Sequence, residues 1–228
     1  MAALGADEPK SLLRIGGEPF AARLLRQAIE AGATEVVVVL GYQAEVVRRA
    51  LSPVLTVDSQ FIVNERFQED VNIHSLSLAL EARPGPCFVV EADVWLADFA
   101  WPLMFSPEDA ARSVWYTRGP FHRDQVGGIL RADAERNITD LRIVPRWAPE
   151  YEGYEKLVGV TKVGPAEAEA FAARLRRSRD DNLRQYWLNP WIESLAQLPC
   201  VARDLGSRGA SSVNTPEEYQ ALVAELSG

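Results

Sequence analysis

The chain has 228 residues, of which 47% are hydrophobic and 25% charged, and this balance is that of a globular protein rather than a disordered one. The length favours one α/β domain over two very small ones. Lys and Arg total 24 against 32 Asp and Glu, so the net charge is −8. That charge argues against a protein that tracks nucleic-acid phosphates, but it permits a small phosphorylated ligand.

The number of cysteines and the length of the apolar runs indicate where in the cell the protein is located. Cys87 and Cys200 lie far apart without a third cysteine nearby, so we expect free buried thiols rather than a zinc site. The longest apolar run, Val36–Leu40, is far shorter than a membrane-spanning helix. The N-terminal residues lack the basic and apolar regions of a secretory signal. We therefore expect a cytoplasmic protein with no membrane partner.

The first half of the sequence alternates helix and strand patterns. Apolar residues at helical spacing predict a helix over 20–31, which Pro19 opens and Gly32 ends. The run Glu35–Leu40 is almost wholly β-branched, which is typical of a strand buried on both faces of a parallel sheet. Further helices are predicted at 43–51 and 73–82, and further strands at 60–63 and 87–90. This alternation predicts an α/β layer whose ligands bind at the carboxyl ends of the strands.

The second half is typical of an antiparallel or mixed extension of the sheet. Strands are predicted at 113–117, 128–131, 138–144, 156–162 and 200–202, and helices at 165–177 and about 181–195. Thr215, Pro216 and Glu218 form a capping-box pattern, which predicts the start of a C-terminal helix.

Two charged residues could carry chemistry. Asp93 follows a buried strand, where a carboxylate is costly unless it has a partner or a ligand. It could hold Mg²⁺ against a nucleotide's phosphates, or it could cap a helix or pair with a cation. Lys10 lies between Pro9 and an apolar Leu12-Leu13 pair. It is either a point charge for a phosphate or an exposed loop lysine.

Weaker candidates lie elsewhere in the chain. Asn72 and Ser75 stand where a helix begins, and there they could contact a polar ligand or simply cap the helix. His74 and His122, the two histidines, lie in separate segments without a second metal ligand at suitable spacing. Complete motifs of serine hydrolases, zinc proteases and Walker loops are absent from the sequence.

Aromatic residues gather in the second half, among them Trp115, Tyr154 and several further tryptophans. Glu152 and Glu155 lie beside Tyr154. Because ring faces attract cations, such a group could form a box for an amine-bearing substrate. The alternative is that these aromatic residues belong to the core.

Three blocks resemble the sugar-phosphate nucleotidyltransferase superfamily. Pro9–Phe20 reads PKSLLRIGGEPF, which resembles the block P-K-x-L-L-x-[VI]-G-G-x-P-[LF]. Glu91–Val94 is similar to the metal motif, and Ser212–Tyr219 to the closing [DN]-T-P-E-D-[LY] block. The resemblance covers nearly the whole chain. It implies a Rossmann-like nucleotidyltransferase fold, with a mixed, mostly parallel sheet flanked by helices.

Three further segments resemble the branch of phosphocholine and 2-aminoethylphosphonate cytidylyltransferases. They are Asn64–Phe67, Asn72–Leu76 and Tyr154–Val160. The resemblance implies transfer of CMP from CTP to a small phosphorylated or phosphonate acceptor, with Mg²⁺ as cofactor and pyrophosphate as product. Two alternatives stay open: a sugar-phosphate nucleotidyltransferase that uses another NTP, and a non-catalytic nucleotide-binding relative.

The same resemblance implies roles for individual residues. Lys10 and Asp93 would be catalytic, and Asp93 and Asn214 would hold the metal. Asn214 stands where many relatives have a carboxylate. The resemblance therefore leaves open whether one or two metal ions bind. The acceptor would contact Trp115, Tyr154 and Glu155. The nucleotide would contact Leu4, Gly5, Gly41, Tyr42, Asn72, Ser75, Glu91 and Ala92.

The N-terminal region departs from the family pattern. Relatives begin with a strand and a glycine-rich loop ahead of the P-K pair, but here Met1–Glu8 contains no G-x-R. Three explanations stay open: an omitted disordered loop, an internal start, or a degenerate relative. We expect one domain over 1–228, with a nucleotide-binding half (1–110), an acceptor-binding part (111–211) and a closing segment (212–228). We expect a monomer or a homodimer.

Overall fold

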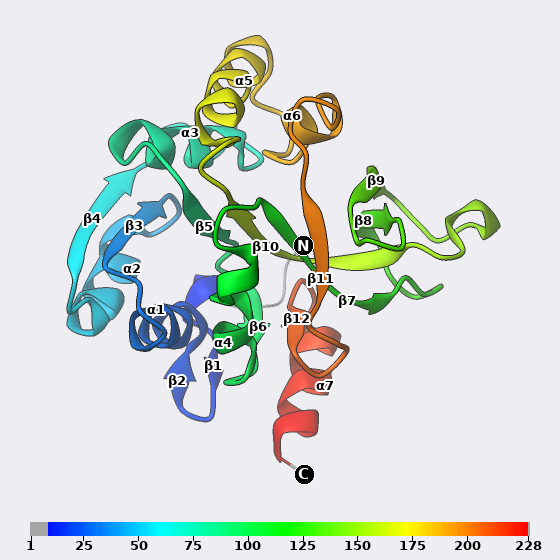
Figure 1. Cartoon of the computed structure of the whole chain (residues 1–228). Helices are drawn as coiled ribbons and strands as arrows, with labels where there is room; N and C mark the ends of the chain where they lie inside the picture. Colours follow the sequence, from blue (N-terminus) through cyan, green and yellow to red (C-terminus); the bar gives the residue numbers. More distant parts are fainter. Residues whose placement is uncertain (1–8, 228) are drawn as a thin grey trace.

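The computed structural model describes residues 9–227, and Figure 1 shows how their helices and strands are arranged around a mixed sheet. The strands are β1 (Arg14–Ile15), β2 (Glu18–Pro19), β3 (Glu35–Leu40), β4 (Asp58–Val63), β5 (Cys87–Val90), β6 (Val94–Leu96), β7 (Val114–Pro120), β8 (Gly127–Ala132), β9 (Ile138–Val144), β10 (Glu155–Val163), β11 (Val201–Asp204) and β12 (Ala210–Ser212). The helices are α1 (Phe20–Glu30), α2 (Ala44–Leu51), α3 (Ile73–Ala82), α4 (Ala100–Met104), α5 (Ala168–Asp181), α6 (Asn189–Ile192) and α7 (Pro216–Ser227), preceded by the short 3₁₀ helix η1 (Lys10–Leu12).

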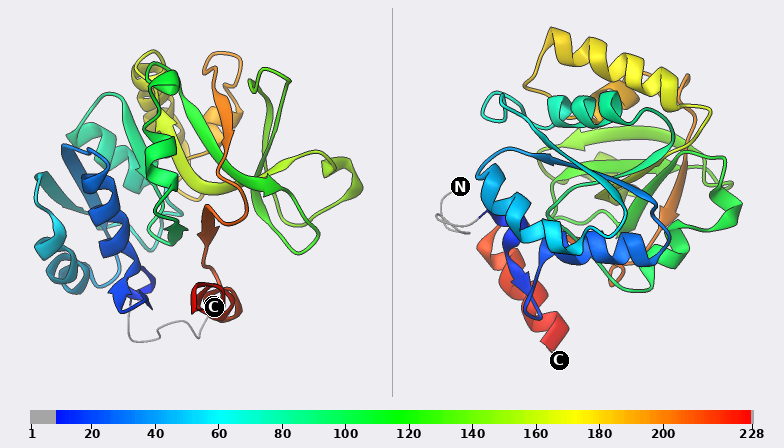
Figure 2. Two further views of the ribbon diagram at one scale, coloured as in Figure 1. Left: turned by 60° about the horizontal axis from the view of Figure 1, so that its bottom comes forward. Right: turned by 90° about the vertical axis from the view of Figure 1, so that its left-hand side faces the viewer.

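The largest sheet has six strands in the order β11-β7-β10-β8-β9, with β5 also paired to β10. β3 and β4 form a separate parallel pair, and β6 and β12 form a short antiparallel ribbon. Helices α3 and α5 lie on one side of the strands and α1 and α2 on the other (Figure 2, right). The α/β class and the mixed sheet are therefore confirmed.

The expected predominance of parallel pairs is wrong for the described strands. Within the largest sheet only β11 and β7 are parallel, whereas β10 is antiparallel to β5, β7 and β8. An apolar run shows that both faces of a strand are covered, and helices can cover both faces whatever the strand direction. The hydrophobic pattern therefore could not reveal how these strands pair.

Two further expectations needed correction. The valines of β3 are half-buried rather than buried, because the described structure pairs this strand on one edge alone, with β4. The helix expected at about 181–195 is reduced to the four residues of α6, which begins beside Pro190. The Thr215 capping box is confirmed, since the Glu218 amide donates to Thr215 Oγ1 at 3.2 Å.

The apolar core divides into several clusters on the two sides of the sheet. The largest contains Trp115, Phe171, Trp187 and Trp191 and fills the space between β7, β10 and helices α3, α5 and α6. A second cluster, under α1 and α4, contains Val94 and Val160. These clusters hold β5 and β10 in place. The carboxyl end of β5 and the first residues of β10 contribute to the candidate site.

Candidate active site

Lys10, Asp93 and Asn214 meet at one point. The Lys10 ammonium donates to Asp93 Oδ2 at 2.6 Å and to Asn214 Oδ1 at 3.0 Å. The residues are 83 and 204 positions from Lys10 in the sequence. The structure thus brings together the three residues that the family resemblance singles out in its first, middle and last blocks.

Local structure explains how this meeting arises. Pro9 precedes η1, and the buried Leu12 anchors that turn under α1 and α2. Asp93 lies in the turn between β5 and β6. The ribbon of β6 and β12 carries the closing block to the same place, where the Val213 amide donates to the Asp93 carbonyl at 3.0 Å.

The oxygen atoms at this point fit a hard divalent cation. Asp93 supplies a carboxylate and Asn214 an amide oxygen, and both now accept from the same lysine. Mg²⁺ is usually held by one or two carboxylates, together with waters and substrate phosphates. In residues 9–227 no group of three or more His, Cys, Asp or Glu is placed to hold a metal by itself. The donor set therefore suits a cation shared with a nucleotide's phosphates.

Glu91 lies beside this point in a closed network of hydrogen bonds. Its Oε1 accepts from Trp187 Nε1 at 3.1 Å and from Asn72 Nδ2 at 3.4 Å. Asn72 Oδ1 in turn accepts from the Trp187 amide at 2.9 Å. Burial, and then the nearby Asp93, raise the pKa of the Glu91 carboxyl above its usual range. Asn72 therefore links the start of α3 to the end of β5 instead of capping its own helix.

Lys156 lies near Glu91 and is a further candidate site residue, which the motifs did not single out although it falls within the Tyr154–Val160 segment. Its ammonium donates to the Leu157 carbonyl at 2.9 Å and, at 3.4 Å, to that of Gly128. Burial lowers the pKa of Lys156 to about 8, while the nearby Glu91 works against that shift. Among the residues that the structure describes, Lys156 forms no salt bridge, so it is a half-buried cation without a direct anionic partner.

Arg118 brings another positive charge to the same side of the sheet. Its guanidinium donates to Ser211 Oγ on β12 at 3.0 Å. Its positive charge contributes to the lowered pKa of Lys156. Lys10 and Lys156 thus provide positive charge near Glu91, and Arg118 adds a third charge near Lys156. Such a group of cations favours the binding of an anionic ligand.

The remaining nucleotide candidates lie in separate parts of the structure. Gly41 and the half-exposed Tyr42 follow β3; a Cβ on Gly41 would lie 2.7 Å from that of Phe67, so close packing requires glycine there. Ser75 lies in the first turn of α3, where its hydroxyl donates to Asp70 and accepts from Asn64. Asp70, two residues before Asn72, also accepts from the Ser75 amide. Ala92 lies in the turn beside Asp93, whereas Leu4 and Gly5 lie outside the described residues.

The three acceptor candidates are placed differently from what an aromatic box requires. Trp115 is buried and stacks on Trp187 with ring centroids 5.2 Å apart. Glu155 accepts a bidentate contact from Arg136 at 2.5 and 2.8 Å, and this contact lowers the pKa of its carboxyl. Tyr154 is buried and donates to Asp140. None of these contacts joins Trp115, Tyr154 or Glu155 to Lys10 or Asp93.

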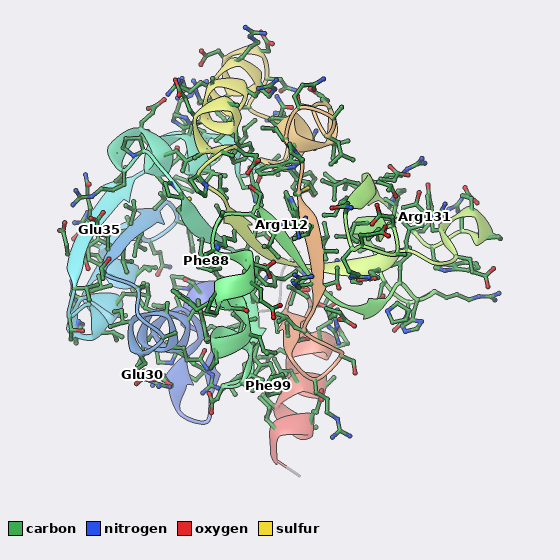
Figure 3. The ribbon with its side chains drawn as sticks, viewed as in Figure 1. Glu30, Glu35, Phe88, Phe99, Arg112 and Arg131 are labelled. Carbon is green, nitrogen blue, oxygen red and sulfur yellow. The ribbon has the colours of Figure 1, made fainter. Side chains whose placement is uncertain are left out.

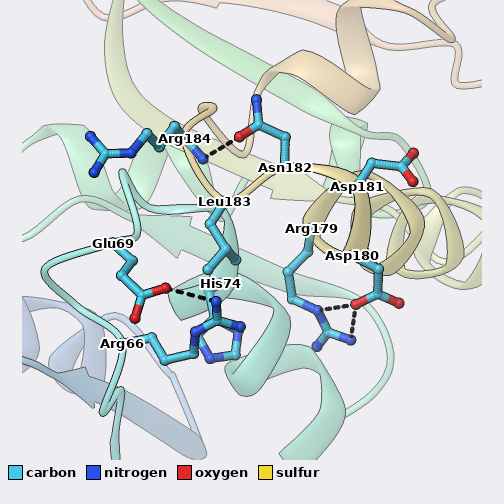
Figure 4. A pocket seen from close by; sticks show the side chains of 9 residues that line it. All are labelled: Arg66, Glu69, His74, Arg179, Asp180, Asp181, Asn182, Leu183 and Arg184. Carbon is cyan, nitrogen blue, oxygen red and sulfur yellow. Dashed lines mark hydrogen bonds and ion pairs between the residues drawn. The ribbon is translucent and has the colours of Figure 1, made fainter.

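A cleft of about 700 Å³ lies between the loop before α3 and the end of α5, and Figure 4 shows its lining. Arg66 pairs with Glu69 at 2.8 Å, and Arg179 pairs with Asp180 at 2.8 Å. His74 lines the same cleft. Because its charges are largely paired with one another and Lys10 and Asp93 do not line it, this cleft is not the reaction site.

Comparisons with known proteins give one family match and several solved structures of similar fold. Residues 3–144 match the model of the MobA-like NTP transferase domain. The comparison with curated proteins finds no significant match. The CTP:phosphocholine cytidylyltransferase LicC from Streptococcus pneumoniae has a similar fold, with a TM-score of 0.80 at 18% identity over 96% of this chain and 90% of that one.

Two further solved structures share the fold. The inositol-1-phosphate CTP transferase from T. maritima has a TM-score of 0.77 at 16% identity, over 98% of this chain and 87% of that one. A UDP-glucose pyrophosphorylase has a TM-score of 0.74 at 13% identity, over 96% and 90%. At these identities the likeness concerns the fold. Over residues 9–227, no helix has the length and apolar character needed to cross a membrane.

Proposed function

Since the chain belongs to the MobA-like NTP transferase family, we propose that it transfers CMP from CTP to a small phosphorylated or phosphonate acceptor. The observation that carries the proposal is the meeting of Lys10, Asp93 and Asn214 at the ends of β5 and β12. CTP is proposed because segments of the sequence resemble the cytidylyltransferase branch. Two of the structurally similar enzymes are also named for CTP.

The reaction forms one bond and breaks one. A phosphate or phosphonate oxygen of the acceptor attacks the α-phosphorus of CTP. The bond from that phosphorus to the oxygen bridging to the β-phosphate breaks, and pyrophosphate leaves with the electron pair. Little covalent chemistry is required of the protein, so positioning and neutralisation of charge account for the rate. Lys10 would place its ammonium against the charge that develops on the phosphates.

Asp93 and Asn214 would hold Mg²⁺ in this proposal. The cation supplies neutralisation of phosphate charge when it is bound. Lys10 now donates to both oxygen donors, so we expect it to turn from them toward the phosphates when the cation binds. Asn214 contributes a neutral oxygen, which makes one metal a better fit than two.

Lys156 and Arg118 would bind the acceptor's reacting phosphate. Lys156 is half-buried and its hydrogen bonds go to main-chain carbonyls, so an incoming anion would be its first direct charged partner. Asn72 and Glu91 would form the nucleoside side of the site, and Gly41 and Tyr42 would lie at its edge. We place the reaction in the cytoplasm, where Cys87 and Cys200 would stay reduced.

The test is a titration with CTP, UTP, GTP and ATP in the presence of Mg²⁺, followed by measurement of pyrophosphate release with a panel of phosphorylated acceptors. We expect release with CTP and at least one acceptor. Turnover with another nucleotide alone would instead favour a sugar-phosphate nucleotidyltransferase. Binding of nucleotide without any release would favour a non-catalytic relative.

A further inference from the structure

The strand β10 contains a bulge at Gly159. The step from Leu157 to Thr161 on β10 matches the shorter step from Thr117 to Trp115 on β7, so β10 carries extra residues between these two pairs. Gly159 lies among them with a φ of +70°, a left-handed conformation that favours glycine. Bulges of this kind redirect the groups around them and are frequent beside active sites.

The bulge faces the end of β5. The Glu91 amide donates to the Gly159 carbonyl at 3.0 Å. Val158 and Val160, on either side of Gly159, both belong to the cluster under α1 and α4. Because side chains alternate along a strand, a side chain at position 159 would lie on the opposite face, which is the face of Trp187.

Glu91 lies on that same face. Phe88, labelled on β5 in Figure 3, packs in the cluster under α1 and α4, whereas the next residue, Val89, packs in the cluster of Trp187. The alternation brings Glu91 to the side of Trp187, where its Oε1 accepts from the indole N–H at 3.1 Å. The Glu91 side chain and the missing side chain of the bulge therefore compete for one space.

A side chain at position 159 has no room beside the Glu91 carboxylate. A Cβ added to Gly159 would lie 2.5 Å from Glu91 Oε2 and 3.0 Å from Val94 Cγ2. The first distance is shorter than any that real Cβ atoms tolerate, so the carboxylate would have to turn away. Since Glu91 Oε1 holds both Trp187 and Asn72, that turn would break the contacts that link β5 to α3.

We infer that Gly159 is a positioning residue of the reaction site: the bulge and its absent side chain hold the Glu91 carboxylate, and with it Asn72, where the nucleotide binds. This role rests on the proposed function, in which Asn72 and Glu91 form the nucleoside side of the site. Gly159 touches neither substrate in this account, and its effect passes through Glu91.

The reaction centre itself is held by other contacts. Lys10 donates to the Asp93 carboxylate, and the Val213 amide donates to the Asp93 carbonyl. Neither contact involves β10. A change at Gly159 should therefore weaken nucleotide binding more than it slows the chemical step.

The first experiment does not depend on turnover. The chain has six tryptophans, and a ¹H–¹⁵N correlation spectrum of the full chain resolves their indole N–H groups. Trp187→Phe identifies the Trp187 cross-peak, and Gly159→Ala should move that cross-peak more than any other indole. Gly206→Ala is the matched control, since Gly206 has a φ of +74° and a Cβ there would meet no described atom within 4 Å. An unmoved Trp187 cross-peak, or an equal shift in the control, overturns the inference.

The second experiment measures pyrophosphate release from CTP. Gly159→Ala should raise the KM for CTP about tenfold with kcat within about threefold of wild type, because hydrogen bonds that place the nucleoside are lost. Gly206→Ala should leave both values near those of wild type. A fall in kcat with an unchanged KM for CTP overturns the positioning role. Absence of release by the wild type with every nucleotide and acceptor overturns the proposed function, and the indole spectrum then still shows whether Gly159 holds Glu91.

A double-mutant cycle covers the case in which Gly159→Ala does not fold. Urea denaturation should show a clearly smaller loss of stability for Gly159→Ala in the Glu91→Ala background than in the wild type, because the carboxylate that blocks the new methyl group is gone. The backbone strain at position 159 is the same in both backgrounds. Equal losses in the two backgrounds, or failure of the double variant to fold, overturn the inference.

Discussion

Asp93 and Glu155 are both paired carboxylates at strand ends, yet their pairs differ in kind. Asp93 meets a single ammonium at one oxygen, and that lysine is shared with the neutral Asn214. Glu155 receives two guanidinium bonds and a further one from the Thr117 hydroxyl. The first arrangement leaves oxygen atoms available to a cation, whereas the second satisfies the carboxylate within the protein. The comparison shows what separates a binding site from a structural ion pair. The difference is whether carboxylate oxygen atoms remain available to a ligand, and not the type of residue.

The largest effect is expected at Asp93. Asp93→Asn should lower kcat for pyrophosphate release by about 100- to 1000-fold, because it removes the charge that holds the metal and orients Lys10. Asp98→Asn is the matched control, since Asp98 also pairs with one basic residue, Arg23, at 2.7 Å and is largely exposed. Equal rates of pyrophosphate release by Asp93→Asn and Asp98→Asn would show that Asp93 is only a structural ion pair.

Lys156→Met should raise the KM for the acceptor by roughly tenfold to a hundredfold, because a desolvated cation no longer meets the phosphate. The pH profile provides a sharper test. The pKa of Lys156 is lowered to about 8, so the acceptor's kcat/KM should fall as pH rises through this value in the wild type. Lys156→Met should not show this fall in kcat/KM. If it did, a group other than Lys156 would cause the fall.

The same lowered pKa has a consequence for stability. Between about pH 8 and the ordinary lysine value of 10.5, the unfolded chain binds more protons at Lys156 than the folded one. The wild type should therefore gain free energy of unfolding relative to Lys156→Met as pH rises across this range. Urea denaturation at several pH values measures the difference.

Glu155→Gln should act on stability rather than on the reaction. It weakens a partly buried ion pair with Arg136, so the free energy of unfolding should fall by about 1–2 kcal/mol, with kcat/KM close to that of the wild type. Urea denaturation and the pyrophosphate assay report the two quantities separately. A large loss of kcat/KM with unchanged stability would show that Glu155 takes part in acceptor binding.

The smallest effect is expected for Tyr154→Phe. The substitution keeps the ring in its aromatic cluster and removes the hydroxyl that donates to Asp140. We expect a loss of about 1 kcal/mol in the free energy of unfolding. Denaturation of Tyr151→Phe, an aromatic neighbour in the same cluster, provides the control. Acceptor KM should stay within about twofold of wild type, since the Tyr154 hydroxyl bonds to Asp140 and not to Lys10 or Asp93.

The candidate site could be predicted where local sequence carries the signal. The P-K block and the two later blocks pointed to Lys10, Asp93 and Asn214, which the fold brings into contact. The helix at 73–82 and the Thr215 capping box are confirmed for the same reason, because periodicity and caps act over a few residues. Lys156 could not be predicted, since nothing in its neighbours along the chain reveals that it is half-buried and bonded to main-chain carbonyls.

The sequence by itself determined the α/β class and most of the helices and strands, and its motifs pointed to Lys10, Asp93 and Asn214. Only the tertiary structure decided which strands are antiparallel and which carboxylates are already satisfied. The physical reason is the range of the interactions. Propensity, capping and hydrophobic period depend on neighbours along the chain, whereas burial and charge pairing depend on residues that may be 200 positions away, as Lys10 and Asn214 are (204 apart).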